Sequence, residues 1–369
     1  MAFIVLLAAA AAVIAFVLHL ATKNHRSHPT YSLPPGNLGI PVIGQTFSLL
    51  HALRTNTDDR WFRARIKRYG PVSKMSVLGS PTVLLAGTAA NHFIFTNEDL
   101  ILTQTRALRS LLRRSILTLT GDKLKQVRSA LQGYLRPEMV RRYVGKMDIE
   151  VRRQLKLNWV GRSTVNVLPM ARNLTLGVIC SVVFGEEAAT IVDALGTDFQ
   201  LLEQDEIANK KGTDGALTWE HVSSMKYTWR VALETLRTVP PVFGSFRTAT
   251  KDIEYQGYHI PKGWKVFAAQ SITHMDSRFF TEPTKFDPSR FEKRSSIPPY
   301  SFLPFGGGPR MCPRTEFSRV ETMVAMHYLV TQFRWKLCFK DEAYKKDPKP
   351  TPVFGCPVEL ELREPYNDL

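Results

Sequence analysis

Residues 304–313, Pro-Phe-Gly-Gly-Gly-Pro-Arg-Met-Cys-Pro, are the most informative stretch of this 369-residue chain. Three consecutive glycines lack a Cβ atom, so their backbone can pass close to something flat and bulky. Cys312 follows, just before the amphipathic segment 315–333, which predicts a long helix. The amides and dipole at a helix N-terminus favour a thiolate over a thiol. A thiolate beside Arg310 suits an iron porphyrin, with sulfur on the metal and guanidinium on a propionate. The simpler alternative is an inert buried cysteine after a glycine-rich turn.

The same stretch resembles the heme-binding loop of cytochrome P450, Phe-x-x-Gly-x-Arg-x-Cys-x-Gly. The positions that match are Phe305, Gly308, Arg310 and Cys312, and the final glycine is replaced by Arg314. The resemblance implies a P450-like fold with heme b as cofactor. It also implies that Cys312 is the axial metal ligand and catalytic residue, with Phe305, Gly308 and Arg310 among the cofactor-binding residues.

Two further marks of the family precede the loop in the expected order. Glu234-Thr-Leu-Arg237 resembles the Glu-x-x-Arg of the K helix, and residues 286–291, Phe-Asp-Pro-Ser-Arg-Phe, resemble the loop that follows it. Glu-x-x-Arg alone occurs often by chance, whereas the ordered trio of motifs is specific. By resemblance, Glu234, Arg237 and Arg290 form a buried ionic triad that fixes the core and does no chemistry.

Two more arginines occupy positions that resemble those of heme-binding arginines in the family. Arg128 lies where the family's C helix offers an arginine to a heme propionate, although the usual aromatic residue four positions earlier is Leu124 here. Arg247 resembles a third propionate partner. Both could instead be ordinary surface arginines. By the same resemblance, the hydrophobic substrate pocket is lined by Val242, Phe243, Val353 and Phe354.

Residues 33–190 and 200–369 resemble plant microsomal members that oxidise triterpenoids, diterpenoids and steroid-like skeletons, including taxane-type hydroxylases. The resemblance implies a monooxygenase that hydroxylates such a substrate with dioxygen. Electrons would come from NADPH through a cytochrome P450 reductase, so NADPH acts only indirectly.

One expected part of the family's sequence is missing. The central I helix carries an Ala/Gly-Gly-x-Asp/Glu-Thr motif that relays protons, and no such motif occurs here. Near residues 199–205 the chain passes from an F-like helix straight to a J-like one, which predicts an internal deletion of the G, H and I helices. The alternative function is therefore a catalytically impaired, truncated member that binds heme or the reductase.

The N-terminus predicts a membrane anchor. Residues 2–21 are apolar and uncharged, and at about 1.5 Å per helical residue they span about 30 Å, one bilayer core. Lys23 and Arg26 follow, which places the N-terminus in the lumen and the body in the cytosol. We therefore expect a single-pass protein of the endoplasmic reticulum membrane. A cleaved signal peptide is the alternative, although no basic n-region precedes the run.

The charge of the chain bears on its binding partners, and its cysteine content bears on disulfides and zinc sites. The formal net charge is +16, and residues 101–160 hold 14 Lys/Arg against 4 Asp/Glu. This run is either a solvated helical face or a docking surface for an acidic electron donor. No recognition-module signature accompanies it, so we expect no nucleic acid partner. The four cysteines show no CxxC spacing, which argues against a disulfide scaffold or a zinc ribbon.

Hydrophobic periodicity predicts an α+β fold, mostly α, without internal repeats. We expect residues 1–22 to be the membrane anchor, 23–44 a basic, proline-rich linker and 45–369 a heme-thiolate domain with its deletion near 199–205. Helices are expected over 57–69, 121–158 with a break at Pro137, 164–184, 218–238 and 315–333. Strands are expected over 72–78, 82–86, 252–258 and 264–269.

Overall fold

The computed structural model of the chain describes residues 32–40, 42–103, 115–184, 216–340, 342–346 and 349–363. The chain divides into two compact units, each built from three separate segments. Unit 1 comprises residues 1–120, 242–281 and 297–310, and unit 2 comprises residues 121–241, 282–296 and 311–369. The part expected to be one heme-thiolate domain, 45–369, contributes to both units.

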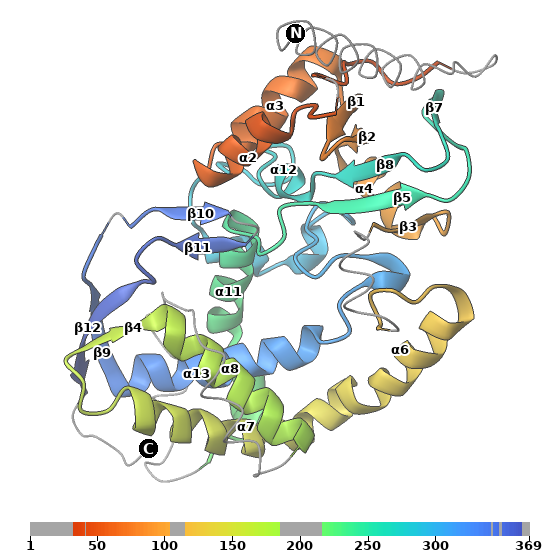
Figure 1. The fold of residues 1–369 in the computed structure, drawn as a ribbon. Coiled ribbons are helices and arrows are strands. Elements are labelled where there is room, and N and C mark those ends of the chain that lie inside the picture. Colours follow the sequence, from red (N-terminus) through yellow and green to blue (C-terminus); the bar gives the residue numbers. More distant parts are fainter. Residues whose placement is uncertain are drawn as a thin grey trace, which may run out of the picture. The chain divides into compact units, whose positions relative to one another are not determined.

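A five-stranded sheet forms the centre of unit 1. Its spatial order is β1 (Val72–Val77), β2 (Ser80–Leu85), β8 (Lys265–Ala268), β5 (Ser245–Ala249) and β3 (Leu100–Leu102) (Figure 1). β1 and β2 pair as an antiparallel hairpin, whereas β2 and β8 run parallel. The hairpin turn has positive φ at both Leu78 and Gly79, the twist that favours tight hairpins.

Among the described residues, unit 1 also contains four α-helices and a second hairpin. They are α2 (Thr46–Arg54), α3 (Asp58–Tyr69), α4 (Thr88–Thr96), α12 (Gln270–His274) and the β6–β7 hairpin (Ile253–Tyr255, Tyr258–Ile260). Phe62 of α3 is fully buried and stacks on Phe267 of β8, with ring centroids 5.4 Å apart. Aromatic packing of this kind joins the helix to the sheet.

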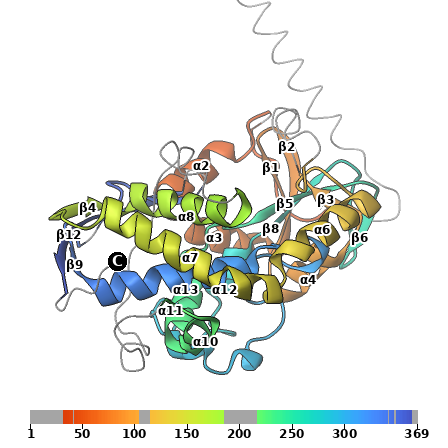
Figure 2. The ribbon, with the colours of Figure 1, turned by 90° about the horizontal axis from the view of Figure 1, so that it is seen from below.

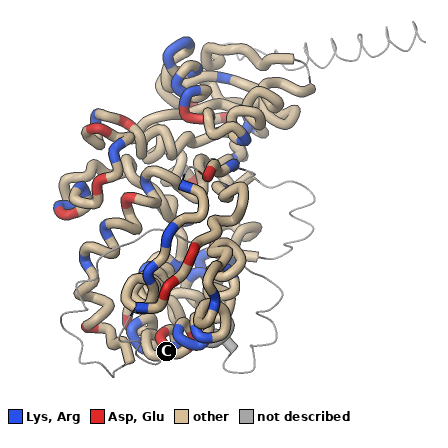
Figure 3. The backbone as a smooth tube through the Cα atoms, turned by 90° about the vertical axis from the view of Figure 1, so that its left-hand side faces the viewer, with Lys and Arg blue, Asp and Glu red and all other residues tan. Residues whose placement is uncertain are grey.

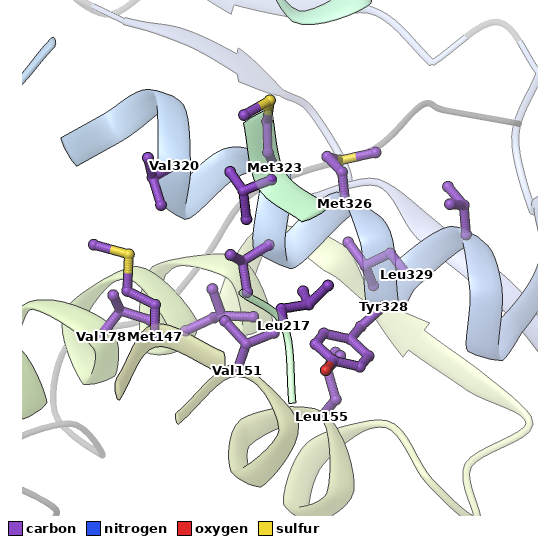
Figure 4. Packing of buried hydrophobic residues seen from close by; sticks show 14 of the residues in the cluster. Met147, Val151, Leu155, Val178, Leu217, Val320, Met323, Met326, Tyr328 and Leu329 are labelled. Carbon is purple, nitrogen blue, oxygen red and sulfur yellow. The ribbon is translucent and has the colours of Figure 1, made fainter. Parts of the chain in front are cut away.

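Unit 2 is mainly helical. The helices within its described residues are α6 (Gly121–Leu135), α7 (Pro137–Asn158), α8 (Val167–Phe184), α10 (Trp219–Ser224), α11 (Lys226–Thr238) and α13 (Thr315–Gln332). Figure 2 shows α7, α8 and α13. The core lies where α7 faces α13. In Figure 4, Met147, Val151 and Leu155 of α7 lie across from the apolar side chains of α13, with Val178 of α8 beside Met147.

Short strands occupy the rest of unit 2. A three-stranded sheet has the order β4 (Thr164–Asn166), β12 (Pro357–Leu362) and β9 (Phe333–Leu337), and β10 (Tyr344–Lys346) pairs with β11 (Pro350–Pro352). The 3₁₀ turns η2 (Pro288–Phe291) and η3 (Arg294–Ser296) belong to this unit, whereas η4 (Gly308–Arg310) belongs to unit 1.

Several expected elements are confirmed. α3, the β1–β2 hairpin and α13 form where periodicity placed them, and the break at Pro137 separates α6 from α7. Pro137 is the first residue of α7, where its missing N–H costs no helical hydrogen bond.

Other expectations need correction. The single helix expected over 218–238 is wrong, because buried Met225, with ψ of 60°, separates α10 from α11. The segment 164–184 begins as the strand β4 before α8 starts. The expected strand 252–258 is β6 and the start of β7, with a turn at Gln256 and Gly257.

Two expectations lie outside the described residues: the membrane anchor at 2–21 and the deletion near 199–205. In the part of the chain that the structure describes, no helix is both long enough and apolar enough to cross a bilayer.

Candidate functional site

The glycine-rich loop is held against α4 within unit 1. Gly308 has φ of +62°, and a Cβ atom placed there would lie 2.0 Å from the carbonyl oxygen of Phe95. The sequence predicted close approach to a flat group, whereas the described neighbour at Gly308 is the backbone of α4. Before the loop, the N–H of Leu303 donates to Nε2 of buried His274 at 2.9 Å. Phe305, between these two anchors, is half-buried.

Two arginines, Arg247 and Arg310, bring positive charge to unit 1. Arg247 on β5 is only 5% exposed, its Nη1 donates to the Phe246 carbonyl at 3.3 Å, and its guanidinium lies 5.3 Å from the ring centroid of Phe95. Burial, with the positive charge of Arg310 adding to it, lowers the pKa of Arg247 to about 10. No carboxylate among the described residues pairs with Arg247. A buried cation of this kind favours an anionic ligand.

Arg310 is itself positioned by the backbone. Its Nη2 donates to the carbonyl oxygen of Leu119 at 2.8 Å, within the same unit. The structure therefore brings together Arg247 and Arg310, two of the expected cofactor-binding residues. An anion with two negatively charged groups, such as a porphyrin with its propionates, fits this pair chemically.

Cys312 lies at the entrance to α13 in unit 2. The cysteine is half-buried, and its carbonyl oxygen accepts a hydrogen bond from Oγ1 of Thr315 at 2.9 Å. Arg128 of α6 donates from Nη2 to the carbonyl oxygen of Met311 at 2.7 Å. Arg128 therefore touches the residue next to the cysteine. Leu124, four residues earlier, is buried.

Arg314, in place of the family's second glycine, adopts an ordinary backbone conformation. Its φ is −99°, so the position does not require glycine. The guanidinium lies 4.9 Å from the ring centroid of Phe317, one turn into α13. The arginine side chain thus folds onto its own helix, where a cation over an aromatic face is favourable.

The ionic triad that the resemblance implied is present and buried. Glu234 and Arg237 of α11 form two charge-assisted hydrogen bonds of 2.7 Å, and both side chains are fully buried. Nε of Arg290, in η2, lies 3.4 Å from Oε1 of Glu234. The same carboxylate oxygen accepts the N–H of Asp287 at 2.9 Å. The triad therefore joins α11 to η2 within unit 2.

Of the residues expected to line a substrate pocket, one is in a core and three are exposed. Phe243 packs against Phe267 in unit 1, with ring centroids 5.8 Å apart, whereas Val242 is exposed. In unit 2, Val353 and Phe354 are exposed, and Phe354 contacts Phe339 with ring centroids 5.1 Å apart.

The sequence reasoning missed one buried acid. Glu321 of α13 is 6% exposed, and its Oε1 has no hydrogen-bond partner among the described residues. Burial raises the pKa of Glu321 to about 7, although the positive charge of Arg314 and a hydrogen bond from Thr175 of α8 oppose the rise. A lone acid inside the apolar stripe of 315–333 was the signal that could have identified it.

In the basic run, residues 101–160, all four acidic residues form ion pairs within the run. Each of its four acids pairs with a basic residue of the same run: Asp122 with Lys125, Glu138 with Arg136, Asp148 with Arg152 and Glu150 with Arg153. The Lys and Arg positions along the described backbone are blue in Figure 3.

The donor set fits a heme. The sulfur of Cys312 would hold the iron of a heme, and Arg247 and Arg310 would pair with its propionates. Within the described residues, no cluster of three or more His, Cys, Asp or Glu side chains could hold a metal ion alone.

Comparison with known proteins identifies the family. A family model described as Cytochrome P450 matches residues 198–360. A Beta-amyrin 28-monooxygenase of Kalopanax septemlobus is 31% identical, with 89% of this chain and 92% of that protein covered. A Taxoid 14-beta-hydroxylase of Taxus cuspidata is also 31% identical, covering 90% and 87%. The chain belongs to the cytochrome P450 family, whose members are monooxygenases, and its relatives are plant terpenoid-oxidising enzymes.

A solved structure agrees on the fold. The retinoic acid-bound cyanobacterial CYP120A1 is 25% identical with a TM-score of 0.75, covering 90% of this chain and all of that one. The sequence alignments contain more positions than this chain contributes residues. The one to the Kalopanax protein extends over 441 positions, whereas 89% of 369 residues is about 328, so about 113 positions lack a residue of this chain.

Proposed function

We propose that the chain is a heme-thiolate monooxygenase that hydroxylates a terpenoid or steroid-like substrate. The hydroxylation would use dioxygen and electrons that NADPH supplies through a cytochrome P450 reductase. Support comes from the family, from relatives whose names specify beta-amyrin and a taxoid, and from the residues around Cys312. A fused-ring terpenoid is large and apolar, so its binding would be driven mainly by burial of hydrophobic surface.

Each site residue has a proposed role. Cys312 would be the axial thiolate, held at the start of α13 by the bond from Thr315 to its carbonyl. Arg247 and Arg310 would bind the propionates of heme b, and Arg128 would support the backbone beside the cysteine or reach a propionate itself. Gly308 and Phe305 would shape the loop. Heme iron, when bound in this way, supplies the binding and reduction of dioxygen.

We further propose a location and a domain plan. The uncharged run at 2–21 supports a single-pass anchor in the endoplasmic reticulum membrane with residues 45–369 in the cytosol, and 23–44 as the linker. Residues 35–36 of this linker pack on unit 1. The N–H of Lys74 donates to the Pro35 carbonyl at 2.8 Å, and a Cβ atom at Gly36 would lie 2.5 Å from the Lys74 carbonyl.

The observation that carries the proposal is the buried guanidinium of Arg247, which lies near Arg310 and for which the described residues provide no carboxylate partner. The test is the carbon monoxide difference spectrum of the reduced, purified chain. A thiolate-type band that disappears in Cys312→Ala and persists in Cys338→Ala supports the assignment, since Cys338 is exposed. Heme content should also fall in Arg247→Leu. A band that survives Cys312→Ala would overturn it.

A second candidate function rests on the missing motif. No acid-threonine motif of the I-helix type occurs in the sequence, and about 113 positions of the Kalopanax alignment lack a residue of this chain. These facts support a truncated member that binds heme or occupies the reductase without turnover. Candidates such as beta-amyrin or a taxane, incubated with chain and reductase, discriminate the two functions: hydroxylated product indicates the monooxygenase, and reductase binding without product the truncated form.

A further inference from the structure

Two buried polar side chains bind the segment that precedes the glycine-rich loop. They are Asn91 of α4 and His274 of α12, and both are 0% exposed. Nδ2 of Asn91 donates to the carbonyl oxygen of Tyr300 at 3.0 Å, and Nε2 of His274 accepts the N–H of Leu303 at 2.9 Å. All four residues belong to unit 1, although they come from three separate stretches of the chain. We call residues 300–303 the approach segment.

The approach segment packs directly against the glycine-rich loop. A Cβ atom placed at Gly307 would lie 3.4 Å from Cε1 of Tyr300 and 3.4 Å from Cδ2 of Leu303. The N–H of Gly306 also donates to the Leu303 carbonyl at 3.1 Å. Because packed interiors transmit small displacements, a shift of the approach segment would move the loop residues that precede Arg310.

Tyr300 has a backbone conformation that depends on its surroundings. Its φ is +63°, in the left-handed region that residues other than glycine rarely adopt. Such conformations persist only where neighbouring groups fix them, and they are frequent at ligand sites. Asn91 fixes the Tyr300 carbonyl, and the ring of His92 meets the ring of Tyr300 edge-on with centroids 4.8 Å apart. Asn91 therefore holds the backbone where the approach segment begins.

Asn91 is not explained by packing of the core. Its Nδ2 donates a second hydrogen bond to Oγ1 of Thr273 at 3.1 Å, whereas its Oδ1 has no hydrogen-bond partner among the described residues. A buried amide oxygen without a partner lowers stability, so packing alone would favour an apolar side chain of similar size, such as leucine. The amide at this position therefore serves the geometry of the approach segment.

The held segment leads to the residues proposed to bind heme. Gly308 packs on the Phe95 carbonyl of α4, the helix that also carries Asn91, and Arg310 follows two residues later. We infer that Asn91 and His274 are positioning residues that hold the glycine-rich loop in the shape that receives heme. The inference rests on the proposed function, and it adds two residues that act through the backbone of the approach segment.

Heme loss from variants of the full chain tests the inference. Asn91→Leu and His274→Leu remove the anchoring atoms, whereas His274→Gln keeps an acceptor oxygen near the position of Nε2. Thr46→Val is the control, because Oγ1 of buried Thr46 also accepts a backbone N–H in unit 1, that of Leu78 at 2.8 Å. Transfer of heme to an excess of heme-free myoglobin measures the rate of loss. We expect several-fold faster loss from the two leucine variants, and rates close to that of the parent from His274→Gln and Thr46→Val.

The carbon monoxide difference spectrum gives a second readout. The fraction of bound heme with the thiolate-type band should fall several-fold in Asn91→Leu and in His274→Leu. His274→Gln should restore it, and Thr46→Val should leave it unchanged. Heme loss and spectra of the leucine variants that match those of Thr46→Val would overturn the inference.

A measurement without heme separates the inference from the proposed function. Mass spectrometry follows amide hydrogen exchange of residues 300–308 in the heme-free parent and variants, and parent-like exchange of β1 and β2 identifies the variants that are folded. Exchange of residues 300–308 should be several-fold faster in each folded leucine variant and unchanged in Thr46→Val. Parent-like exchange in the leucine variants would overturn the inference. Faster exchange together with a parent chain that binds no heme through Cys312 would support the anchoring and count against the proposed function alone.

Discussion

At the scale of single residues, Glu321 makes the stability of unit 2 depend on pH between about 4.5 and 7. Its pKa of about 7 in the folded chain lies above the ordinary value of 4.5, so between these values the folded chain holds a proton that the unfolded chain has released. The contribution of Glu321 to stability is complete below pH 4.5 and is lost as pH rises through 7. The loss amounts to about 3 kcal/mol, since one pKa unit corresponds to about 1.4 kcal/mol.

Glu321→Gln should remove this dependence. Glutamine stays neutral, so its presence should remove the loss of stability. As pH rises from 4.5 to above 7, the free energy of unfolding of the variant minus that of the parent should increase by about 3 kcal/mol. Urea unfolding at a series of pH values measures it. Glu316→Gln is the control, because Glu316 is on the same helix and bonds Arg319. If Glu321→Gln and its parent had parallel pH profiles, Glu321 would not be the buried acid described here.

Gly308 combines a left-handed backbone with close packing. Gly308→Ala would place a Cβ atom 2.0 Å from the Phe95 carbonyl at φ of +62°. Gly263→Ala is a matched control in the same unit, with φ of +83° and no atom within 4 Å. The control should cost about 1–2 kcal/mol of backbone strain. Gly308→Ala should cost about 1–3 kcal/mol more through overpacking. Denaturant midpoints of both variants give the comparison, and equal losses would mean that α4 yields easily.

At the scale of elements, the bond between α11 and η2 depends on one carboxylate. Glu234→Gln removes the charge that compensates fully buried Arg237, and we expect a loss of about 3–5 kcal/mol. Asp122→Asn breaks another i,i+3 pair, the one between Asp122 and Lys125. Their side chains are 89% and 75% exposed, so the loss should be about 0–1 kcal/mol. Thermal or urea unfolding compares the two variants. Similar losses would show that the triad contributes no more than a surface pair.

Element boundaries marked by a local glycine or proline could be predicted from the sequence. Elements fixed by contacts between residues distant in the chain could not. Pro137 marks the α6–α7 boundary, and Gly79 marks the β1–β2 turn. Met225 separates α10 from α11 without glycine or proline, because its side chain is drawn into the core of unit 2. The strands β9 to β12 were missed, since strands of three to six residues depend on partners that the local pattern does not reveal.

In the candidate site, too, some features could be predicted from a local motif and others depend on distant residues. Cys312 and Arg310 lie within one motif, so the sequence could single them out. The lack of a carboxylate partner for Arg247 among the described residues, and the burial of Glu321, depend on residues distant in the chain and appear only in the structure.

At the scale of the whole molecule, three separate segments build each unit, and each unit has its own core. An internal deletion therefore removes cover from side chains that are far away in sequence. Exposed apolar area costs about 25 cal/mol per Å², so uncovering about 400 Å² costs about 10 kcal/mol. Net stability of a domain is only about 5–15 kcal/mol.

We therefore expect the chain as written to have little or no monooxygenase activity. Hydroxylation needs a wall that excludes bulk water and delivers protons in order, and the sequence lacks the acid-threonine motif that supplies this in the family. The measurement compares this chain with one into which the helices expected to be absent are inserted from the Kalopanax relative, each with reductase and beta-amyrin or a taxane. The restored chain should retain more heme and form more product. Comparable rates from the two chains would show that other residues of this chain exclude water and move protons, and that the expected gap has no catalytic consequence.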